Sequence, residues 1–455
     1  MEMISILLLL DTLMLAVSYQ LASINDAAAW SMIGFTGLAI LWQLAIFSCT
    51  PSPTRMLRVA VEIRLPHVIQ GLVQLCIYVY WGLYWDQPAK YAIFIVAQIG
   101  CAYMLDMLLS LSRHQEWRAG FGPVPIMLSI NLFIWFKPEY FYMQLSMVTV
   151  TYLAKEFLTW QRDGKTRHIF NPSGFSLTVA AVLLLCSRTA GTYTTGVNLV
   201  ESFELMPSFY EVIFILGLVV QILFATTPVT IGAVLFHFVL FFIVSWMLGG
   251  RAAAFPIDRS IFLAMTLLVP DPATSPKSAW GRLLFGATYG TAVFLTALGL
   301  KYTHQPDYFS KILVIPLLNL MTPWFDRLAH MKINPGQLLA KLGRPLLVTP
   351  WRLKTGSVVL YVCLFLSIIG SLKRPRTTPL GRPWLLPVAD GDTRQMEDQI
   401  FKMLYSRQTY PEVFKPFRFG REIALYPKIS AIYDGPWPPL SIERKAAGPD
   451  RIDGP

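Results

Sequence analysis

The chain has 455 residues, of which 54% are hydrophobic and only 14% are charged, and its mean hydropathy is +0.50. This composition excludes an ordinary soluble domain and is typical of a membrane protein with many spans. The net charge of +11 is spread over separate loops rather than gathered on one face, which argues against a nucleic-acid partner. The lipid bilayer is therefore the first partner that the sequence predicts.

Apolar runs of membrane-spanning length begin near the first residue and recur as far as residue 372. The first run opens with Met-Glu-Met and has no basic segment, so we interpret it as a span rather than a cleaved signal peptide. The shorter runs at 121–137, 172–187 and 256–270 are expected to be half-helices or tilted segments. We therefore predict an all-α polytopic fold with about 10 to 13 spans. The predicted segments are 3–22, 29–49, 68–85, 90–111, 121–137, 139–159, 172–187, 209–226, 229–248, 256–270, 282–300, 308–325 and 357–372.

Basic residues concentrate in loops that would all lie on one side of the membrane. Because Lys and Arg in short loops are retained in the cytoplasm, we predict a cytoplasmic N-terminus. We expect the membrane to be the inner membrane of a bacterium. When the predicted spans are counted from a cytoplasmic N-terminus, the basic residues after 372 fall outside the cell. Either one predicted segment does not cross the membrane, or the tail is an exception to the rule. The residues that carry the prediction are Arg55, Arg58, Arg64, Arg113, Arg118, Arg162, Lys165 and Arg167.

Ionisable residues inside spans are costly unless they face a cavity or a partner. Asp106, in CAYMLDMLLSL, is the clearest case. Lys155-Glu156 is interpreted as an ion pair near the membrane interface, and Asp258-Arg259 as adjacent charges that compensate each other. His237, in LFHFVLFF, is either a buried histidine with its hydrogen bonds satisfied or a proton relay or ligand.

The stretch WQRDGKTRHIFNPSGFSLTVA, at 160–180, joins a basic loop directly to an apolar segment. Asn171, Pro172 and Ser173 form a helix-start signal, because an Asn side chain caps free amides and proline fits the first turn. Such a start beside basic residues can bind phosphate or carboxylate. The alternative is an ordinary capped membrane helix with flanking positive charge. The basic residues are Arg162, Lys165, Arg167 and His168.

A second stretch, LVPDPATSPKSAWGRLLFGATYG at 268–290, repeats this design. Asp271-Pro272 is again interpreted as a cap followed by proline, with Lys277 and Arg282 nearby. Two such junctions predict an internal repeat with paired broken helices around a central site. Three glycines in the following apolar segment predict close backbone packing. They are Gly281, Gly286 and Gly290.

The two stretches resemble the paired Asn-Pro and Asp-Pro motifs of the RnfD/NqrB family, whose members are membrane subunits of Rnf electron-transport complexes and of the sodium-pumping NADH:quinone oxidoreductase. The resemblance covers roughly residues 118–300. It implies a polytopic membrane subunit, related in fold to urea transporters, that carries flavin and couples electron flow to ion movement. By position, the residues that would belong to the broken-helix motifs near flavin are Asn171, Pro172, Asp271, Pro272 and Thr274.

Covalent FMN in that family is attached to the Thr of a Ser-Gly-Ala-Thr stretch between the two motifs, and this chain has no such stretch there. The nearest string, at 285–288, follows the second motif, lacks the Ser and is expected to lie inside a helix, so Thr288 is a poor attachment site. We therefore expect FMN or riboflavin to be held non-covalently. The expected phosphate and stacking contacts are Ser173 at the helix start, Lys165, Arg167, Lys277, Phe170 and Trp280.

After residue 372 the composition changes to a proline- and aromatic-rich tail, 373–455, that follows the transmembrane domain of residues 1–372. Within the tail, 393–408 can form one amphipathic helix. So short a segment buries little core alone. We expect it to dock on the membrane domain or a partner subunit, the alternative being a disordered tail.

Three function classes remain. The first is a subunit of a redox complex that binds flavin, works with other membrane subunits and lies close to a quinone or a cation. The second is a small-solute transporter or channel, and the third is a structural subunit that has lost flavin. No Ser-His-Asp order, nucleotide-binding glycine loop or metal-ligand cluster stands out in the sequence, so neither an autonomous enzyme nor a metal site is predicted. The five cysteines are interpreted as packing residues.

Overall fold

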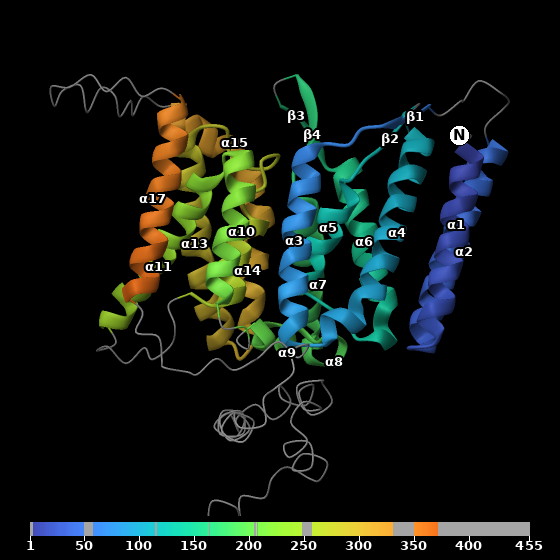
Figure 1. Ribbon diagram of the computed structural model, residues 1–455, viewed down its shortest axis with the longest axis horizontal. Coiled ribbons are helices and arrows are strands. Elements are labelled where there is room, and N and C mark those ends of the chain that lie inside the picture. The colour runs from blue at the N-terminus through green and yellow to red at the C-terminus, as the bar shows by residue number, and fades with distance from the viewer. Residues whose placement is uncertain are drawn as a thin grey trace, which may run out of the picture.

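The computed structural model describes residues 3–49, 58–113, 116–162, 164–203, 206, 208–247, 257–330 and 350–371, and most of them are helical. The long helices run side by side along a common direction, as Figure 1 shows. The helices are α1 (Met3–Ala22), α2 (Asp26–Cys49), α3 (Leu65–Tyr84), α4 (Gln87–Arg113), α5 (Pro123–Asn131), η1 (Pro138–Tyr140), α6 (Phe141–Phe157), α7 (Pro172–Ser187), α8 (Ala190–Tyr193), α9 (Gly196–Ser202), α10 (Phe209–Phe224), α11 (Thr227–Met247), α12 (Arg259–Leu263), η3 (Ala264–Leu268), α13 (Ala279–Tyr302), η4 (Asp307–Phe309), α14 (Ser310–Leu313), α15 (Ile315–His330) and α17 (Pro350–Ser371).

Six helical segments in the described residues are long and apolar enough to cross a membrane: α1, α2, α4, α11, α13 and the segment Asp307–Leu328. Four further apolar helices are shorter. Apolar side chains also point outward, as Leu38 and Leu41 do on α2, which suits contact with lipid rather than water. The chain is therefore a multi-pass membrane protein with an all-α fold, while the larger count of 10 to 13 spans stays a prediction.

Two of the runs expected to be half-helices form short helical segments in the structure. Helix α5 has nine residues and stops at Asn131, whose side chain donates to Met127 O while its own carbonyl accepts from Trp135 Nε1. Helix α12 continues into η3, a π-helical turn in which Val269 N donates to Ala264 O. Such turns leave carbonyls for side-chain donors and occur at functional sites. The third short run forms α7, which has 16 residues.

Two pairs of short strands lie at one end of the helix bundle, and α8 and α9 lie at the other end (Figure 1). Strand β1 (Arg58–Val61) pairs in parallel with β2 (Glu116–Ala119). Strand β3 (Thr159–Arg162) forms an antiparallel hairpin with β4 (Lys165–His168). The sequence did not predict these strands. They bring three of the predicted basic loops to the same end of the molecule.

Helices α11 and α13 are in direct backbone contact, which confirms the close packing predicted from the glycines. A Cβ added at Gly286 would lie 1.9 Å from Val229 O, and one at Gly290 would lie 2.1 Å from Ala233 O. Hydrogen is therefore the largest side chain that fits at either position. Gly281 differs, because its added Cβ would meet Ser278 Oγ and Pro276 in its own chain segment.

The predicted tail of residues 373–455, with its amphipathic helix at 393–408, lies outside the described residues. The same holds for Arg55 and for the residues between α15 and α17. Apart from Asp163, both sequence motifs lie within the described residues.

Candidate functional site

Asn171 begins α7 as the sequence predicts. Its Oδ1 accepts a hydrogen bond from Gly174 N at 3.1 Å and from Ser173 Oγ at 2.8 Å, and Pro172 occupies the first helical turn. These contacts satisfy amide and hydroxyl donors that would otherwise be unpaired at the helix start. The side chain of Asn171 is buried, so the cap is an internal feature of the bundle rather than an exposed anion site.

The remaining donors of Asn171 connect the first motif to distant helices. Asn171 Nδ2 donates to Leu268 O at 2.9 Å, at the end of η3, and Asn171 N donates to Asn319 Oδ1 at 2.9 Å, on α15. Leu268 is the first residue of the second motif. The structure therefore brings the first motif into hydrogen-bond contact with the start of the second.

Asp271 does not cap the following helix, which corrects our interpretation of the Asp-Pro pair. Its Oδ2 accepts from Thr274 Oγ1 at 2.7 Å and from Thr274 N at 3.2 Å, which closes a turn. Helix α13 begins only at Ala279, where Ser278 Oγ accepts from Gly281 N at 2.9 Å. The reason is Pro276: a helix begun at Pro272 would place that proline, which has no N–H, against the carbonyl of residue 272.

The turn after Asp271 is tied to α15 and to the β3–β4 hairpin. Thr322 Oγ1 donates to Thr274 O at 2.7 Å, and Thr274 is almost fully buried. Asp326 accepts from the guanidinium of Arg162 and, at 2.8 Å, from Lys277 N. Arg162, which we named beside the helix start but not among the flavin contacts, is therefore the basic residue that joins the two motifs.

We call the contact between the β3–β4 hairpin and the turn after Asp271 the junction. The other predicted basic residues lie around it. Lys277 is exposed at the rim, and Arg167 is half-buried on β4, where it pairs with Trp160 of β3. Lys165 lies opposite Arg162 in the backbone register of the β3–β4 hairpin. Of the two aromatic residues predicted to stack on flavin, Phe170 packs against Phe175 with ring centroids 4.7 Å apart, and Trp280 is half exposed.

Two buried polar atoms at the junction have no hydrogen-bond partner among the residues that the structure describes. They are Trp160 Nε1 and Ser275 Oγ. Trp160 and Arg162 lie on the same face of β3, because side chains alternate along a strand, and Arg162 Nη1 reaches Ser275 O at 3.5 Å. Buried donors are nearly always satisfied in folded proteins, so each of these two atoms is a candidate donor to a ligand.

His168, at the end of β4, is a titratable group of the same junction. Burial lowers the pKa of its imidazole below the ordinary value, because desolvation disfavours the charged form, while the Asp271 carboxylate acts in the opposite direction. Lys155 and Arg167 lower the pKa further. The second motif thus supplies the negative charge that faces the histidine of the first.

This environment predicts how stability depends on pH. Because the pKa of His168 is lower in the folded than in the unfolded protein, the unfolded chain binds more protons below about pH 6.5. The free energy of unfolding should therefore fall as the pH drops through that value, by at most about 1.4 kcal/mol per pH unit for this one group, and level off below the folded pKa. Unfolding of His168→Gln should lack this component. An identical pH dependence in both proteins would contradict the assignment.

The intramembrane carboxylates pair differently from our interpretation. Lys155 Nζ donates to Asp106 Oδ1 at 2.9 Å, and Trp117 Nε1 donates to Asp106 Oδ2 at 3.0 Å. Glu156 pairs instead with Arg113 at 3.1 Å. Neighbours in sequence point about 100° apart on a helix, so Lys155 and Glu156 reach different partners. These contacts fasten α4, α6 and β2 together near the end that carries the strands.

His237 and Asp258 each have a structural partner. His237 is buried on α11, and its Nδ1 lies 3.2 Å from Gly290 O of α13, which agrees with the interpretation of a satisfied core histidine. Asp258 does not pair with Arg259 but caps α12, accepting from the N–H groups of Ser260 and Ile261. Arg259 donates to Phe203 O at 3.2 Å.

Two buried ionisable residues inside predicted spans were not singled out in the sequence. Lys311, at the start of α14, is fully buried, and Asp11, in the middle of α1, accepts from Gln43 Nε2 at 3.0 Å. Both are single charges in predicted apolar segments, which is the signal that could have identified them.

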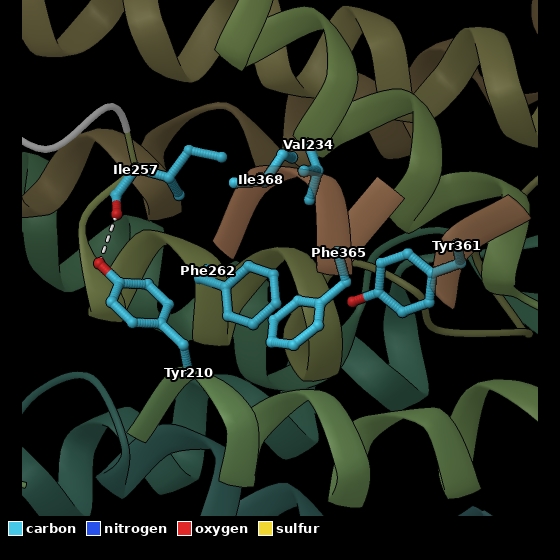
Figure 2. Close-up of a pocket in the computed structure, with 7 residues that line it drawn as sticks. All are labelled: Tyr210, Val234, Ile257, Phe262, Tyr361, Phe365 and Ile368. Atoms are coloured by element: carbon cyan, nitrogen blue, oxygen red, sulfur yellow. Dashed lines mark hydrogen bonds between the residues drawn. The ribbon is translucent and has the colours of Figure 1, made fainter. Parts of the chain in front are cut away.

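A small apolar pocket lies between α10, α11, α12 and α17 (Figure 2), and none of its lining residues belongs to either motif. Its walls are apolar and aromatic side chains. Phe365 stacks on Phe214 with centroids 3.9 Å apart, and Tyr210 Oη donates to Ile257 O at 2.6 Å. The pocket thus belongs to the packing of α17 on the bundle. It is lined by Tyr210, Val234, Ile257, Phe262, Tyr361, Phe365 and Ile368.

No protein-family model matches the chain, and no curated protein is significantly similar to it in sequence.

Proposed function

We propose that this multi-pass membrane protein is a membrane subunit of an electron-transport complex, of the kind that its two motifs resemble. In this proposal FMN or riboflavin is held non-covalently where the β3–β4 hairpin meets the turn after Asp271. The observation that carries the proposal is the pair of buried donors without partners, Trp160 Nε1 and Ser275 Oγ. Arg162, two residues after Trp160 in the first motif, donates to Ser275 O of the second motif.

The residues at the junction fit the chemistry of a flavin. An isoalloxazine ring carries carbonyl oxygens and ring nitrogens that accept hydrogen bonds, and it would supply the redox chemistry. Trp160 and Ser275 would donate to these acceptors, while Arg167 and the exposed Lys277 would hold a phosphate at the rim. Thr288 lies inside α13, where its hydroxyl donates to Leu284 O. A Thr in that position suits non-covalent rather than covalent binding.

We infer an internal repeat from the helix packing, with a pairing that differs from the one predicted from the sequence. Helix α3 packs against the half-helix α5, and α10 packs against the half-helix formed by α12 and η3. Helix α4 packs against α6 as α11 does against α13, and α6 packs against α7 as α13 does against α14 and α15. The matching broken elements are then α5 and α12–η3, instead of the stretches that begin at Asn171 and Asp271.

The proposal is tested by the flavin content of the full chain, purified in mild detergent with FMN and riboflavin present. We expect a yellow protein that releases its flavin on unfolding, so that a denaturing gel shows no fluorescent band at the mass of the chain. A fluorescent band would show a covalent bond and overturn non-covalent binding. A colourless protein with no flavin in the supernatant would overturn the flavin site itself.

Variants locate the flavin. Trp160→Phe and Ser275→Ala should each weaken flavin binding by about tenfold, the equivalent of one hydrogen bond. The matched controls are Trp246→Phe and Ser146→Ala, which change exposed residues away from the junction. Equal losses in variants and controls would place the flavin elsewhere.

A second candidate function, transport of a small neutral solute, is favoured by one observation in the half-helices. Gln74 of α3 donates to Ser129 Oγ of α5 at 2.7 Å, and Gln221 of α10 donates to Thr266 O of η3 at 3.3 Å. The Oε1 atoms of both glutamines are buried without a partner among the described residues. Two such acceptors in matching positions would suit a solute with N–H donors.

The test for transport is flux of urea, as a representative solute of that class, into liposomes that contain the chain alone. Transport predicts flux that falls in Gln74→Leu and Gln221→Leu but not in the control Gln20→Leu, whose side chain is exposed on α1. A chain that neither binds flavin nor passes solute would fit the third class, a structural subunit.

The other membrane subunits, a quinone or a cation remain proposed partners of the redox complex. The basic loops that gather at the strand end of the bundle support a cytoplasmic location for that end and for the N-terminus, while the bacterial inner membrane stays part of the proposal through the resemblance alone. Protease removal of an N-terminal tag in inside-out but not right-side-out vesicles tests this orientation.

A further inference from the structure

Lys311 is a buried ammonium group at the end of the bundle opposite the strands. It lies at the start of α14, and none of its surface is exposed. The neighbouring η4 places Tyr308 against Gly196 of α9, which locates Lys311 near the α8–α9 end seen in Figure 1. A charge buried at this position requires polar partners, because burial without them is costly.

A continuous chain of hydrogen bonds leads from Lys311 toward the surface. Lys311 Nζ donates to Ser260 Oγ at 2.7 Å, and Ser260 Oγ donates to Asp258 Oδ1. Ser260 is buried, whereas Asp258 is half-buried at the start of α12. Every donor in the chain points the same way, from the ammonium through the hydroxyl to the carboxylate. That arrangement is the one that concerted proton transfer requires.

The other charged and titratable groups around Lys311 are few. Asp307 of η4 is exposed and lies within electrostatic range of the ammonium. The Tyr308 ring centre lies 5.9 Å from Nζ, and Tyr289 of α13 donates from its Oη to Lys311 O at 2.7 Å. Helix α7 carries no Asp, Glu, Lys, Arg or His, and those of α15 lie in its last turn and a half. Asp258, reached through Ser260, is therefore the carboxylate in hydrogen-bond connection with Lys311.

We propose that Lys311, Ser260 and Asp258 form a proton-transfer site that connects the interior of the membrane domain to the aqueous phase at the α8–α9 end. In the transfer, an Nζ–H bond of Lys311 breaks as Ser260 Oγ takes the proton, and the O–H bond of Ser260 breaks as Asp258 Oδ1 takes the second proton. Lys311 becomes a neutral amine and Asp258 a neutral acid. No electron is transferred, so the step does not depend on flavin binding.

Geometry favours this role over a purely structural ion pair. A direct Lys–Asp contact would hold the two elements together without a hydroxyl between them, and buried ion pairs are often replaced by apolar residues without loss of stability. Here a serine separates the two charges and orients its hydroxyl from one to the other. The same carboxylate caps α12, so the outer end of the relay has a fixed position.

The test measures how fast the Nζ protons of Lys311 exchange with solvent. The full chain, labelled with ¹⁵N at lysine Nζ and reconstituted in phosphatidylcholine nanodiscs, is transferred to heavy water and followed by magnetic resonance; Lys311→Arg assigns the signal. We expect exchange in the wild type to be about 100-fold faster than in Ser260→Ala, the low end of the contribution of a positioned proton-transfer group. Rates within about a factor of two would overturn the relay.

A matched control and a second readout keep the proposal testable if the lysine variant fails to fold. The signal of Lys90, an exposed lysine paired with Asp86, should exchange at the same rate in wild type and Ser260→Ala. Asp258→Asn keeps a capping side chain but cannot take up the proton. It should lose the infrared carbonyl band of a protonated carboxyl group that the wild type shows during a pH titration. A spectrum without that difference would overturn the role of Asp258.

Discussion

Replacing Gly286 by alanine is expected to lower the free energy of unfolding by about 3 kcal/mol, the upper part of the usual range for overpacking. The added Cβ would lie 1.9 Å from Val229 O, a backbone atom that cannot rotate away. Helices α11 and α13 would have to separate, which would also lengthen the contact between His237 and Gly290 O. Reversible unfolding in mixed detergent micelles, followed by circular dichroism, measures the change.

Gly299 provides the control within the same helix. A Cβ added at Gly299 meets no atom within 4 Å among the described residues, so Gly299→Ala should gain the ordinary helix preference of alanine over glycine, about 1 kcal/mol. The two substitutions are chemically identical, and their effects should have opposite signs. A stabilising effect of Gly286→Ala would show that α11 and α13 are not packed backbone to backbone.

The features that local sequence determines could be predicted. Apolar runs of the right length indicated the positions of the helices, and Asn171-Pro172 indicated a helix start because the capping contacts lie within three residues. The close packing of α13 followed from glycines four residues apart. Each of these signals depends on chain neighbours alone.

The pairing of charges could not be predicted, because it depends on which helices pack together. Arg162 pairs with Asp326, 164 positions later, and Lys155 pairs with Asp106, 49 positions earlier. No periodicity in the sequence indicates either partner. The sequence alone could have excluded an ion pair between Lys155 and Glu156, because adjacent helical residues point in different directions.

Two errors came from signals that were present in the sequence. Pro276 forbids a helix that starts at Pro272, so Ser278 was the better candidate for the cap. Lys311 is the single charged residue of an apolar run, so it could have been singled out as an intramembrane ionisable residue, as Asp106 was. At the junction, the donors Trp160 and Ser275 had no sequence signal, because the lack of a partner is a property of the packed structure.

Asn171→Ala is expected to destabilise the protein more than the loss of a helix cap explains. Losing the cap alone costs about 1 kcal/mol. The substitution also leaves Leu268 O, at the end of η3, without the donor Asn171 Nδ2, and an unpaired buried carbonyl costs about 1 to 3 kcal/mol more. The total loss in free energy of unfolding should therefore be about 3 kcal/mol.

Asn25 separates the two contributions, because it caps α2 through the contact of its Oδ1 with Ala28 N at 3.1 Å and lies at the bundle edge. Asn25→Ala should cost only the cap, about 1 kcal/mol. The excess loss in Asn171→Ala then measures the bond between α7 and η3, which is the contact that joins the two motifs. If both variants lose the same free energy in detergent unfolding, that bond contributes nothing, and the motifs are held together by Arg162 and Asp326 instead.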